Sequence, residues 1–201
     1  MNRHIFNLRD DIKYDYINFN LMSLLPEAVD FLKNNQDKIN WINLCNNPSP
    51  FIISILEENP DKIDWSMLST NPNAIYLLKA NPDKINWKLI SRNPAAIDFL
   101  KANFLRICWI NLSMNPAAID LLNDCPYHVK YSYLSQNPAA IDLIKKNMDK
   151  VNWSGLCQNP AAIEIIEKNM LYRILLSCPF ISTITIKITF YEMIKRFKDL
   201  S

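Results

Sequence analysis

Apolar and polar positions follow one pattern many times along this chain. In one example, "NPNAIYLLKA", small and apolar residues stand at Ala74, Ile75, Leu77 and Leu78. Spacings of one, three and four residues put these side chains on one face of a helix, whereas a strand would need strict alternation. The pattern therefore predicts a helix over residues 71–80.

The dipeptide Asn71-Pro72 marks the start of this helix. The side-chain oxygen of an N-cap asparagine accepts a backbone N–H that has no partner within the helix. Proline at the first helical position loses nothing, because its missing N–H would have had no partner. The same signals open the next copy, "NPAAIDFLKA" from Asn93, where Asp98 and Lys101 also suit the helix dipole.

A second helix is predicted over residues 81–91, "NPDKINWKLIS". It opens at another asparagine, has Asp83 in its first turn, and carries apolar bulk at Ile85, Trp87 and Ile90. The following Asn-Pro ends it, because a residue before proline is pushed out of the helical region. Each Asn-Pro thus ends one helix and starts the next.

Both helices belong to a repeat whose prolines recur every 22 residues, with one interval of 24. An aromatic residue stands seven positions before each of these prolines. We expect these rings to form a structural spine that packs between units and is largely shielded from water. The alternative, a ladder of rings that stack nucleic-acid bases, is disfavoured because apolar residues flank each ring. The spine residues are Phe19, Trp41, Trp65, Trp87, Trp109, Tyr131 and Trp153.

Two helices this short are not stable alone in water, so each unit must bury its apolar face against its neighbours. The predicted fold class is all-α, an α-solenoid of about seven 22-residue two-helix repeats with terminal caps. Residues 1–25 form an N-terminal cap and degenerate first unit, 26–170 the array, and 171–201 a C-terminal cap that ends in an amphipathic helix. Residues 181–189 are rich in β-branched side chains, so a short strand there stays open.

The repeated unit "NPxAIxLLxxNPDKINWxxLSxNP" resembles a short repeat in proteins of amoeba-infecting giant DNA viruses of the mimivirus type. The resemblance covers roughly residues 15–170 and rests on the residues of 71–87 and their copies. It implies a helical-repeat protein of a largely uncharacterised family, and it carries over no catalytic residue. If the chain is viral, its expected location is the host cytoplasm or a viral factory.

Composition narrows the possible chemistry. The chain has 201 residues, 49% hydrophobic and 21% charged, with a net charge of +2, which is ordinary for a folded protein and weak for a polyanion partner. Its only glycine is Gly155, so the glycine-rich motifs that cradle phosphates or expose a nucleophile are absent. Five isolated cysteines, no signal peptide and no membrane-length apolar run indicate a soluble cytoplasmic protein.

Candidate catalytic groups are better explained by structure. The acids recur on what should be the solvated face of the first helix, at Asp30, Asp98, Asp120, Asp142 and Glu164. Two histidines, His4 and His128, give little basis for a metal site. Cys45 and Cys157 occupy a position that is serine in other units, which predicts a small packed site. We therefore expect no enzyme activity, cofactor or metal.

The leading functional hypothesis is a non-enzymatic scaffold that binds another protein, host or viral. Its basis is that inward positions repeat whereas outward positions differ between units. Two alternatives stay open: a self-assembling structural component of a virion or viral factory, and, less favoured, a single-stranded nucleic-acid binder. The candidate partner surface comprises Ser66, Met67, Asn73, Tyr76, Lys88, Asn123 and Tyr133.

Overall fold

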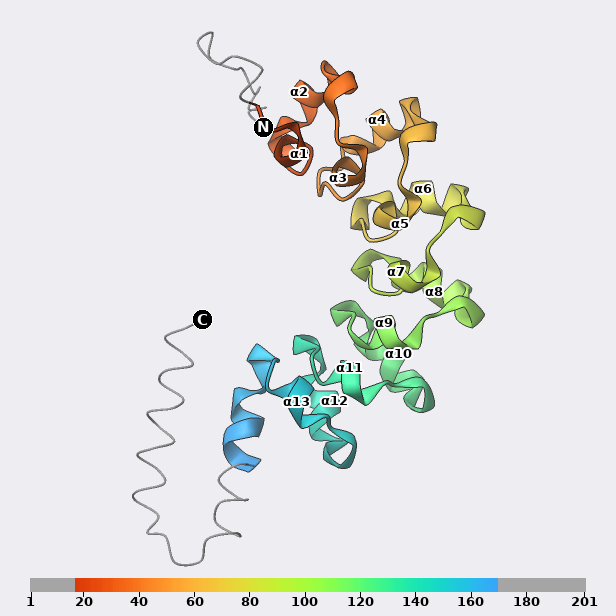
Figure 1. Cartoon of the computed structure of the whole chain (residues 1–201). Coiled ribbons are helices and arrows are strands. Elements are labelled where there is room, and N and C mark those ends of the chain that lie inside the picture. The colour runs from red at the N-terminus through yellow and green to blue at the C-terminus, as the bar shows by residue number, and fades with distance from the viewer. Residues whose placement is uncertain (1–16, 170–201) are drawn as a thin grey trace, which may run out of the picture.

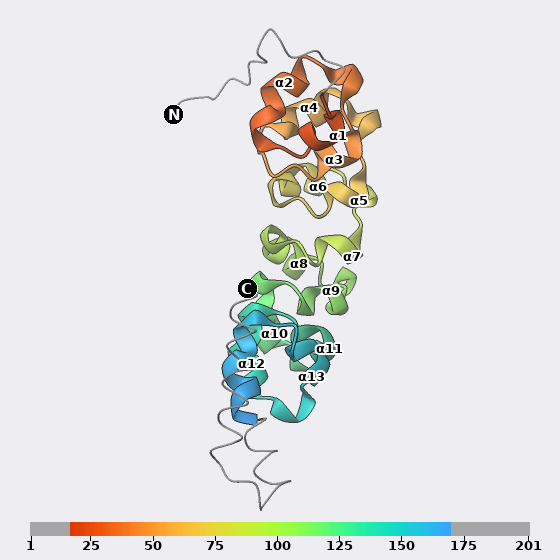
Figure 2. The same ribbon diagram turned by 60° about the vertical axis from the view of Figure 1, so that its left-hand side comes forward.

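The computed structural model describes residues 17–169, and within them every regular element is helical. The helices form two rows that run side by side along an arc, with the odd-numbered row on its inner side (Figure 1). A rotated view separates the same two rows (Figure 2). The predicted all-α solenoid is thus confirmed. The predictions for residues 1–16 and for the C-terminal cap at 171–201, including a strand at 181–189, lie outside the described residues.

The even-numbered row is made of the first helices of the units and the odd-numbered row of the second helices. The even row contains α2 (Val29–Lys33), α4 (Ile52–Glu58), α6 (Ile75–Ala80), α8 (Ile97–Ala102), α10 (Ile119–Asp124) and α12 (Ile141–Lys145). The odd row contains α1 (Phe19–Met22), α3 (Trp41–Cys45), α5 (Trp65–Leu68), α7 (Trp87–Ile90), α9 (Trp109–Ser113), α11 (Tyr131–Leu134) and α13 (Trp153–Leu156).

From Asn71 onward, each first helix begins at its Asn-Pro as predicted. Asn71 accepts the N–H of Asn73 through its side chain, and Pro72 starts a short 3-10 turn that runs into α6. Most of the predicted apolar face is buried, and Ile75 is half-buried. The equivalent 3-10 turns are η2 (Pro26–Ala28), η5 (Pro72–Ala74), η7 (Pro94–Ala96), η9 (Pro116–Ala118), η11 (Pro138–Ala140) and η13 (Pro160–Ala162).

The second helix is not one helix from its asparagine onward, and here the prediction was wrong. Residues 81–91 form a 3-10 turn, an extended residue at Ile85 (ψ 128°), and the single-turn helix α7, which Asn86 caps. Asn81 does not cap the turn; its side-chain amide donates back to the carbonyl of Leu77. The equivalent turns are η3 (Gln36–Lys38), η4 (Pro60–Lys62), η6 (Pro82–Lys84), η8 (Phe104–Arg106), η10 (Pro126–His128) and η12 (Met148–Lys150).

The longer unit places its extra residues at the start of its first helix. Asn47 still accepts a backbone N–H, from Ser49, but residues 48–51 form an irregular segment in place of the usual 3-10 turn before α4. The remainder of the unit returns to register, as the sequence pattern predicts.

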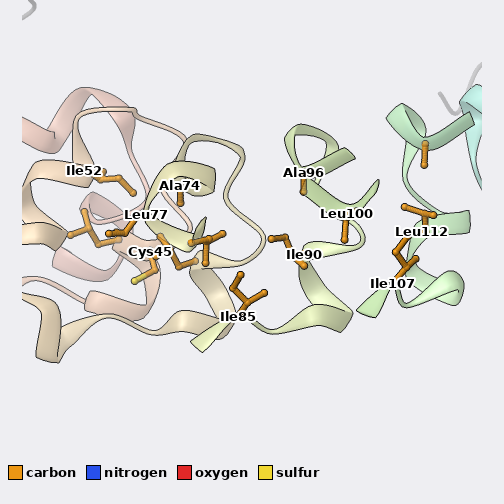
Figure 3. Close-up of a cluster of buried hydrophobic side chains, with 14 of the residues drawn as sticks. Cys45, Ile52, Ala74, Leu77, Ile85, Ile90, Ala96, Leu100, Ile107 and Leu112 are labelled. Carbon is orange, nitrogen blue, oxygen red and sulfur yellow. The ribbon is translucent and has the colours of Figure 1, made fainter. Parts of the chain in front are cut away.

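The core is a continuous aliphatic band between the two rows. Figure 3 shows side chains such as Ile85, Ile90, Ala96 and Leu100 following one another along the stack. The leucine or isoleucine three positions after each aromatic residue is fully buried from α3 onward, as at Leu68 and Ile90. These aliphatic residues, rather than the aromatic rings, form the driest part of the interior.

A row of buried asparagines, the asparagine ladder, runs through the array. The Asn93 Nδ2 group donates to the carbonyl oxygens of Ser69 (3.1 Å) and Asn71 (3.0 Å) in the preceding unit. Its Oδ1 accepts the N–H of Ala95 (3.0 Å), so a single side chain caps its own helix and binds the unit before it. The ladder consists of Asn47, Asn71, Asn93, Asn115, Asn137 and Asn159.

Buried serines join the units at a second place. The Ser91 hydroxyl donates to the carbonyl of Trp87 (2.7 Å) and accepts the N–H of Cys108 (3.0 Å) from the next unit. Ser23, Ser69, Ser113 and Ser135 do the same. Cys45 stands at this position and is buried, as predicted, whereas Cys157 is exposed and differs from that prediction.

Candidate interaction surfaces

The predicted partner residues fall on two separate parts of the array. Ser66, Met67, Lys88 and Tyr133 lie on the short helices of the odd row, whereas Asn73, Tyr76 and Asn123 lie on the even row or the turn before it. All are exposed except Met67, which is half-buried. The structure therefore does not bring these residues together as one face.

Three of these residues also hold neighbouring units together. Ser66 accepts a hydrogen bond from the side chain of Asn86 (3.2 Å), and Asn73 donates to the carbonyl of Pro48 (2.7 Å). The Tyr76 hydroxyl donates to the Glu57 carboxylate, and this hydrogen bond raises the pKa of Tyr76. Their side chains remain exposed, so these contacts position them without removing them from solvent.

The aromatic residues of the predicted spine pack against the core, but their rings are half-buried rather than shielded from water. Each ring packs against the core with part of its surface, while basic groups lie over several rings. Lys84 Nζ lies 4.8 Å from the centre of the Trp65 ring, and the Arg106 guanidinium lies 5.1 Å from that of Trp87. Lys38 covers Phe19 and Lys150 covers Tyr131 in the same way.

These basic residues were not singled out by the sequence analysis, although the signal was present. A basic side chain stands three positions before the aromatic residue in each unit from Lys38 to Lys150. In the folded array, such a side chain covers the ring of the preceding unit instead of its own. A cation over a ring contributes roughly 0.5–1 kcal/mol at a partly exposed site. The position therefore joins successive units.

Three rings meet in the middle of the array. His128 stacks on Trp109 with ring centres 4.3 Å apart, and Phe104 meets both rings edge-on, at 5.3 Å from Trp109 and 5.9 Å from His128. His128 thus occupies the covering position that lysine or arginine holds elsewhere. This cluster brings η8 of one unit against η10 of the next.

Two nearly fully exposed apolar residues flank this cluster. Leu105 in η8 is 97% exposed and Tyr127 in η10 is 98% exposed. Neither was singled out by the sequence analysis. The available signal was a departure from the repeat, because other units hold an aspartate at this position.

Candidate catalytic groups are dispersed. Asp30, Asp98, Asp120, Asp142 and Glu164 are all exposed, as predicted. Among residues 17–169, no group of three or more histidine, cysteine or acidic side chains could hold a metal ion. Burial raises the pKa of the Cys45 thiol to about 11, which disfavours its reactive thiolate form.

No helix in the described part of the chain is long and apolar enough to cross a membrane. Comparison with known proteins adds no relative, since no family model, curated protein or solved structure matches this chain.

Proposed function

We propose that this chain is a non-enzymatic scaffold that binds another protein through exposed positions of its helical array. One observation carries the proposal: buried positions repeat between units, whereas exposed positions beside them do not. Ser69 and Ser91 repeat at one buried position and the asparagine ladder at another. The exposed position after each aromatic residue instead changes from Ile42 to Ser66 to Lys88.

Exposed apolar side chains add to this argument. Ile42, Tyr76, Ile110 and Tyr133 are large and lie in solvent on four different units. Burial of such side chains supplies much of the free energy of protein association. A stack of repeats offers an extended surface over which such anchors can be distributed.

End-to-end self-assembly through the ladder is less favoured. Leu25 stands before Pro26, where later units have a ladder asparagine, and no side-chain hydrogen bond caps the turn that follows. If a second copy stacked before this unit, two carbonyl groups of that copy would need a hydrogen-bond donor from this unit. Leucine cannot supply one, so those carbonyls would lose water without a replacement.

The proposal is tested by capture of partners from amoebal host lysate with the full chain and with Tyr76→Ala/Tyr133→Ala. Both tyrosines are exposed, and the double variant should keep its helical circular dichroism. We expect a defined protein to be retained by the natural chain and lost from the variant. Retention by both chains would overturn the assignment of this surface, and growth of the chain alone beyond a dimer with concentration would favour the structural alternative.

The resemblance to giant-virus repeats guides the choice of lysate only. If the chain is viral, the partner is a host or viral protein of the infected amoeba. Fractionation of infected cells with an antibody to the chain would test whether it resides in the cytoplasm or the viral factory, as expected.

A further inference from the structure

One position of the repeat changes character in two successive units. In the turn before the aromatic residue, the other units carry an exposed aspartate followed by lysine: Asp37, Asp61, Asp83 and Asp149. Two successive units carry Leu105 and Tyr127 instead, and nearly all of each side chain is in solvent. Neither side chain contributes to the stability of the fold by burial, because each buries almost no surface in it.

The two residues belong to one patch. The rings of Phe104 and His128 lie 5.9 Å apart and join η8 to η10, and Leu105 and Tyr127 are the sequence neighbours of these rings. Phe104 is itself 38% exposed. Phe104, Leu105 and Tyr127 are called the apolar patch below. Exposed apolar side chains gathered on two touching turns of a folded protein are typical of a site of interaction.

The apolar patch has a basic border. The two units that form the patch have a basic residue, Arg106 or His128, where the other units have lysine. They lack the aspartate that precedes this lysine elsewhere. Lys130, which is exposed, replaces the asparagine or aspartate that caps the short helix in most other units. Within 103–107 and 125–130 no acidic residue occurs, and the exposed Asp124, just before η10, is the nearest one in sequence. In the other units, the negative charge of the aspartate in this turn is balanced by the positive charge of the lysine that follows it.

We propose that the apolar patch binds an acidic amphipathic segment of another protein, an inference that rests on the proposed scaffold function and names its partner chemistry. Apolar side chains of the segment would cover Leu105 and Tyr127, while its carboxylates would face Arg106 and Lys130. Neighbouring helices pack about 8–10 Å apart. Apolar residues seven apart on a helix are separated by about 10.5 Å and could reach both units.

The chemistry of the patch favours a protein over a nucleic acid. Leu105 has no ring on which a base could stack, and the His128 ring is already stacked on Trp109. Arg106 and Lys130 are too few cations for a row of phosphates. A single segment with both acidic and apolar residues satisfies the whole patch.

The test uses a phage-displayed library of random 16-residue peptides, selected on the full chain. Enriched peptides are then synthesised, and their affinity for the natural chain and for Leu105→Asp/Tyr127→Asp is measured by fluorescence polarisation. Aspartate is the residue that other units hold here, so the variant should fold normally, which circular dichroism checks. The matched control is Phe51→Ala, which removes an exposed aromatic side chain outside both the patch and the candidate partner surface.

We expect enriched peptides to combine acidic and apolar residues, to lose at least about tenfold in affinity for the double variant, and to bind the Phe51→Ala variant unchanged. Failure to enrich such peptides, or equal binding to the double variant, would overturn the inference. The lysate experiment above would still decide the scaffold function separately. Binding of a 20-nucleotide single strand that is lost in the double variant would instead assign the patch to nucleic acid.

Discussion

At the scale of single residues, the most informative side chain is the ladder asparagine. Its oxygen caps a helix and its amide group bonds two carbonyls of the previous unit, and the whole group is buried. Serine, threonine or aspartate could perform the capping but could not donate to both carbonyls. Within residues 17–169, no buried side-chain nitrogen or oxygen lacks a partner. The ladder therefore couples local helix formation to the stacking of units.

We predict that Asn93→Ala lowers the free energy of unfolding by about 2–5 kcal/mol, because two buried carbonyls and the N–H of Ala95 lose their partner. Asn81→Ala is the matched control: this side chain is half-buried and bonds a single carbonyl, so it should cost only about 1 kcal/mol. Urea denaturation followed by circular dichroism measures both. Asn93→Asp keeps the cap but loses both donors; if it were as stable as the natural chain, the ladder would not bind units together.

Cys45 should make stability depend on pH. Burial raises the pKa of its thiol from 9.0 to about 11 in the folded chain, so the unfolded chain loses this proton first. The stabilisation that the protonated Cys45 thiol contributes is therefore intact below about pH 9. The free energy of unfolding should fall as the pH rises from about 9 to about 11. Comparison of urea midpoints at about pH 8 and pH 10.5 tests this, with Cys45→Ser as the control.

The serine variant should lose less stability over that interval, because serine does not ionise there. An equal loss in both chains would contradict the assignment to Cys45. Iodoacetamide provides a second readout: at about pH 8 the exposed Cys157 should react in the folded chain, whereas Cys45 should react only after unfolding.

At the scale of elements, the second half of each unit depends on contacts with its neighbours. The helices of the odd row are one turn long, which is too short to persist alone. In α5 and α7, a cap at the start, a buried leucine or isoleucine, and a half-buried ring under a cation of the next unit hold the helix in place. Their stability is thus a property of the pair of units.

The cap of α9 is a point where the sequence is not at its optimum. Asn86 accepts the N–H of Leu89 at the start of α7 (3.1 Å), but Cys108 forms no such cap for α9. We predict that Cys108→Asn raises the free energy of unfolding by about 0.5–1 kcal/mol. Thermal and urea denaturation measure the gain. Asn86→Ala should cause a loss of similar size, and no change in either variant would mean that these caps do not limit stability.

The cation over a ring can be tested separately. Lys84→Gln should lower the free energy of unfolding by about 0.5–1 kcal/mol, because it removes the charge above the Trp65 ring and keeps most of the side chain. Lys62→Gln is the control, since the contact recorded for Lys62 is an exposed ion pair with Asp61 (3.3 Å), which should contribute less. Equal effects in urea denaturation would argue against the ring contact.

At the scale of the whole molecule, the array is held by contacts between successive units. The hydrogen bonds of the ladder join residues 22 to 26 positions apart, and they repeat along the described array. In such a stack, stability is close to a sum over units and their interfaces. A whole unit can then be removed without loss of the fold.

We predict that deletion of residues 93–114 leaves a folded, shorter array. Asn115 then takes the place of Asn93 and meets the carbonyls of Ser69 and Asn71. Helical circular dichroism per residue should be unchanged, and the thermal midpoint should fall because one interface is lost. Deletion of residues 93–103 is the control: it removes one helix and breaks the register, so helicity should drop. Equal behaviour of the two deletions would contradict a modular stack.

Much of this architecture could be predicted because it is local. Asn71-Pro72, the apolar spacing that follows, and the recurrence of both every 22 residues determined the first helices, the unit boundaries and the solenoid. These signals act within a few residues, where capping and hydrophobic periodicity control the backbone. The break in the second helix was missed because Ile85 leaves the helical region only to bury its side chain in the stack.

The tertiary structure alone decided which residues act between units. A basic residue three positions before a ring covers the ring of the preceding unit, and a cap asparagine bonds that unit's carbonyls, because stacking brings together residues about 20 positions apart. For the candidate interaction surfaces too, one part could be predicted from sequence and another depends on the stack. Sequence identified which positions vary, but only the stack brought the turns of Leu105 and Tyr127 together and placed Tyr76 and Tyr133 in different rows. The reason is that adjacency in a solenoid is set by packing across units.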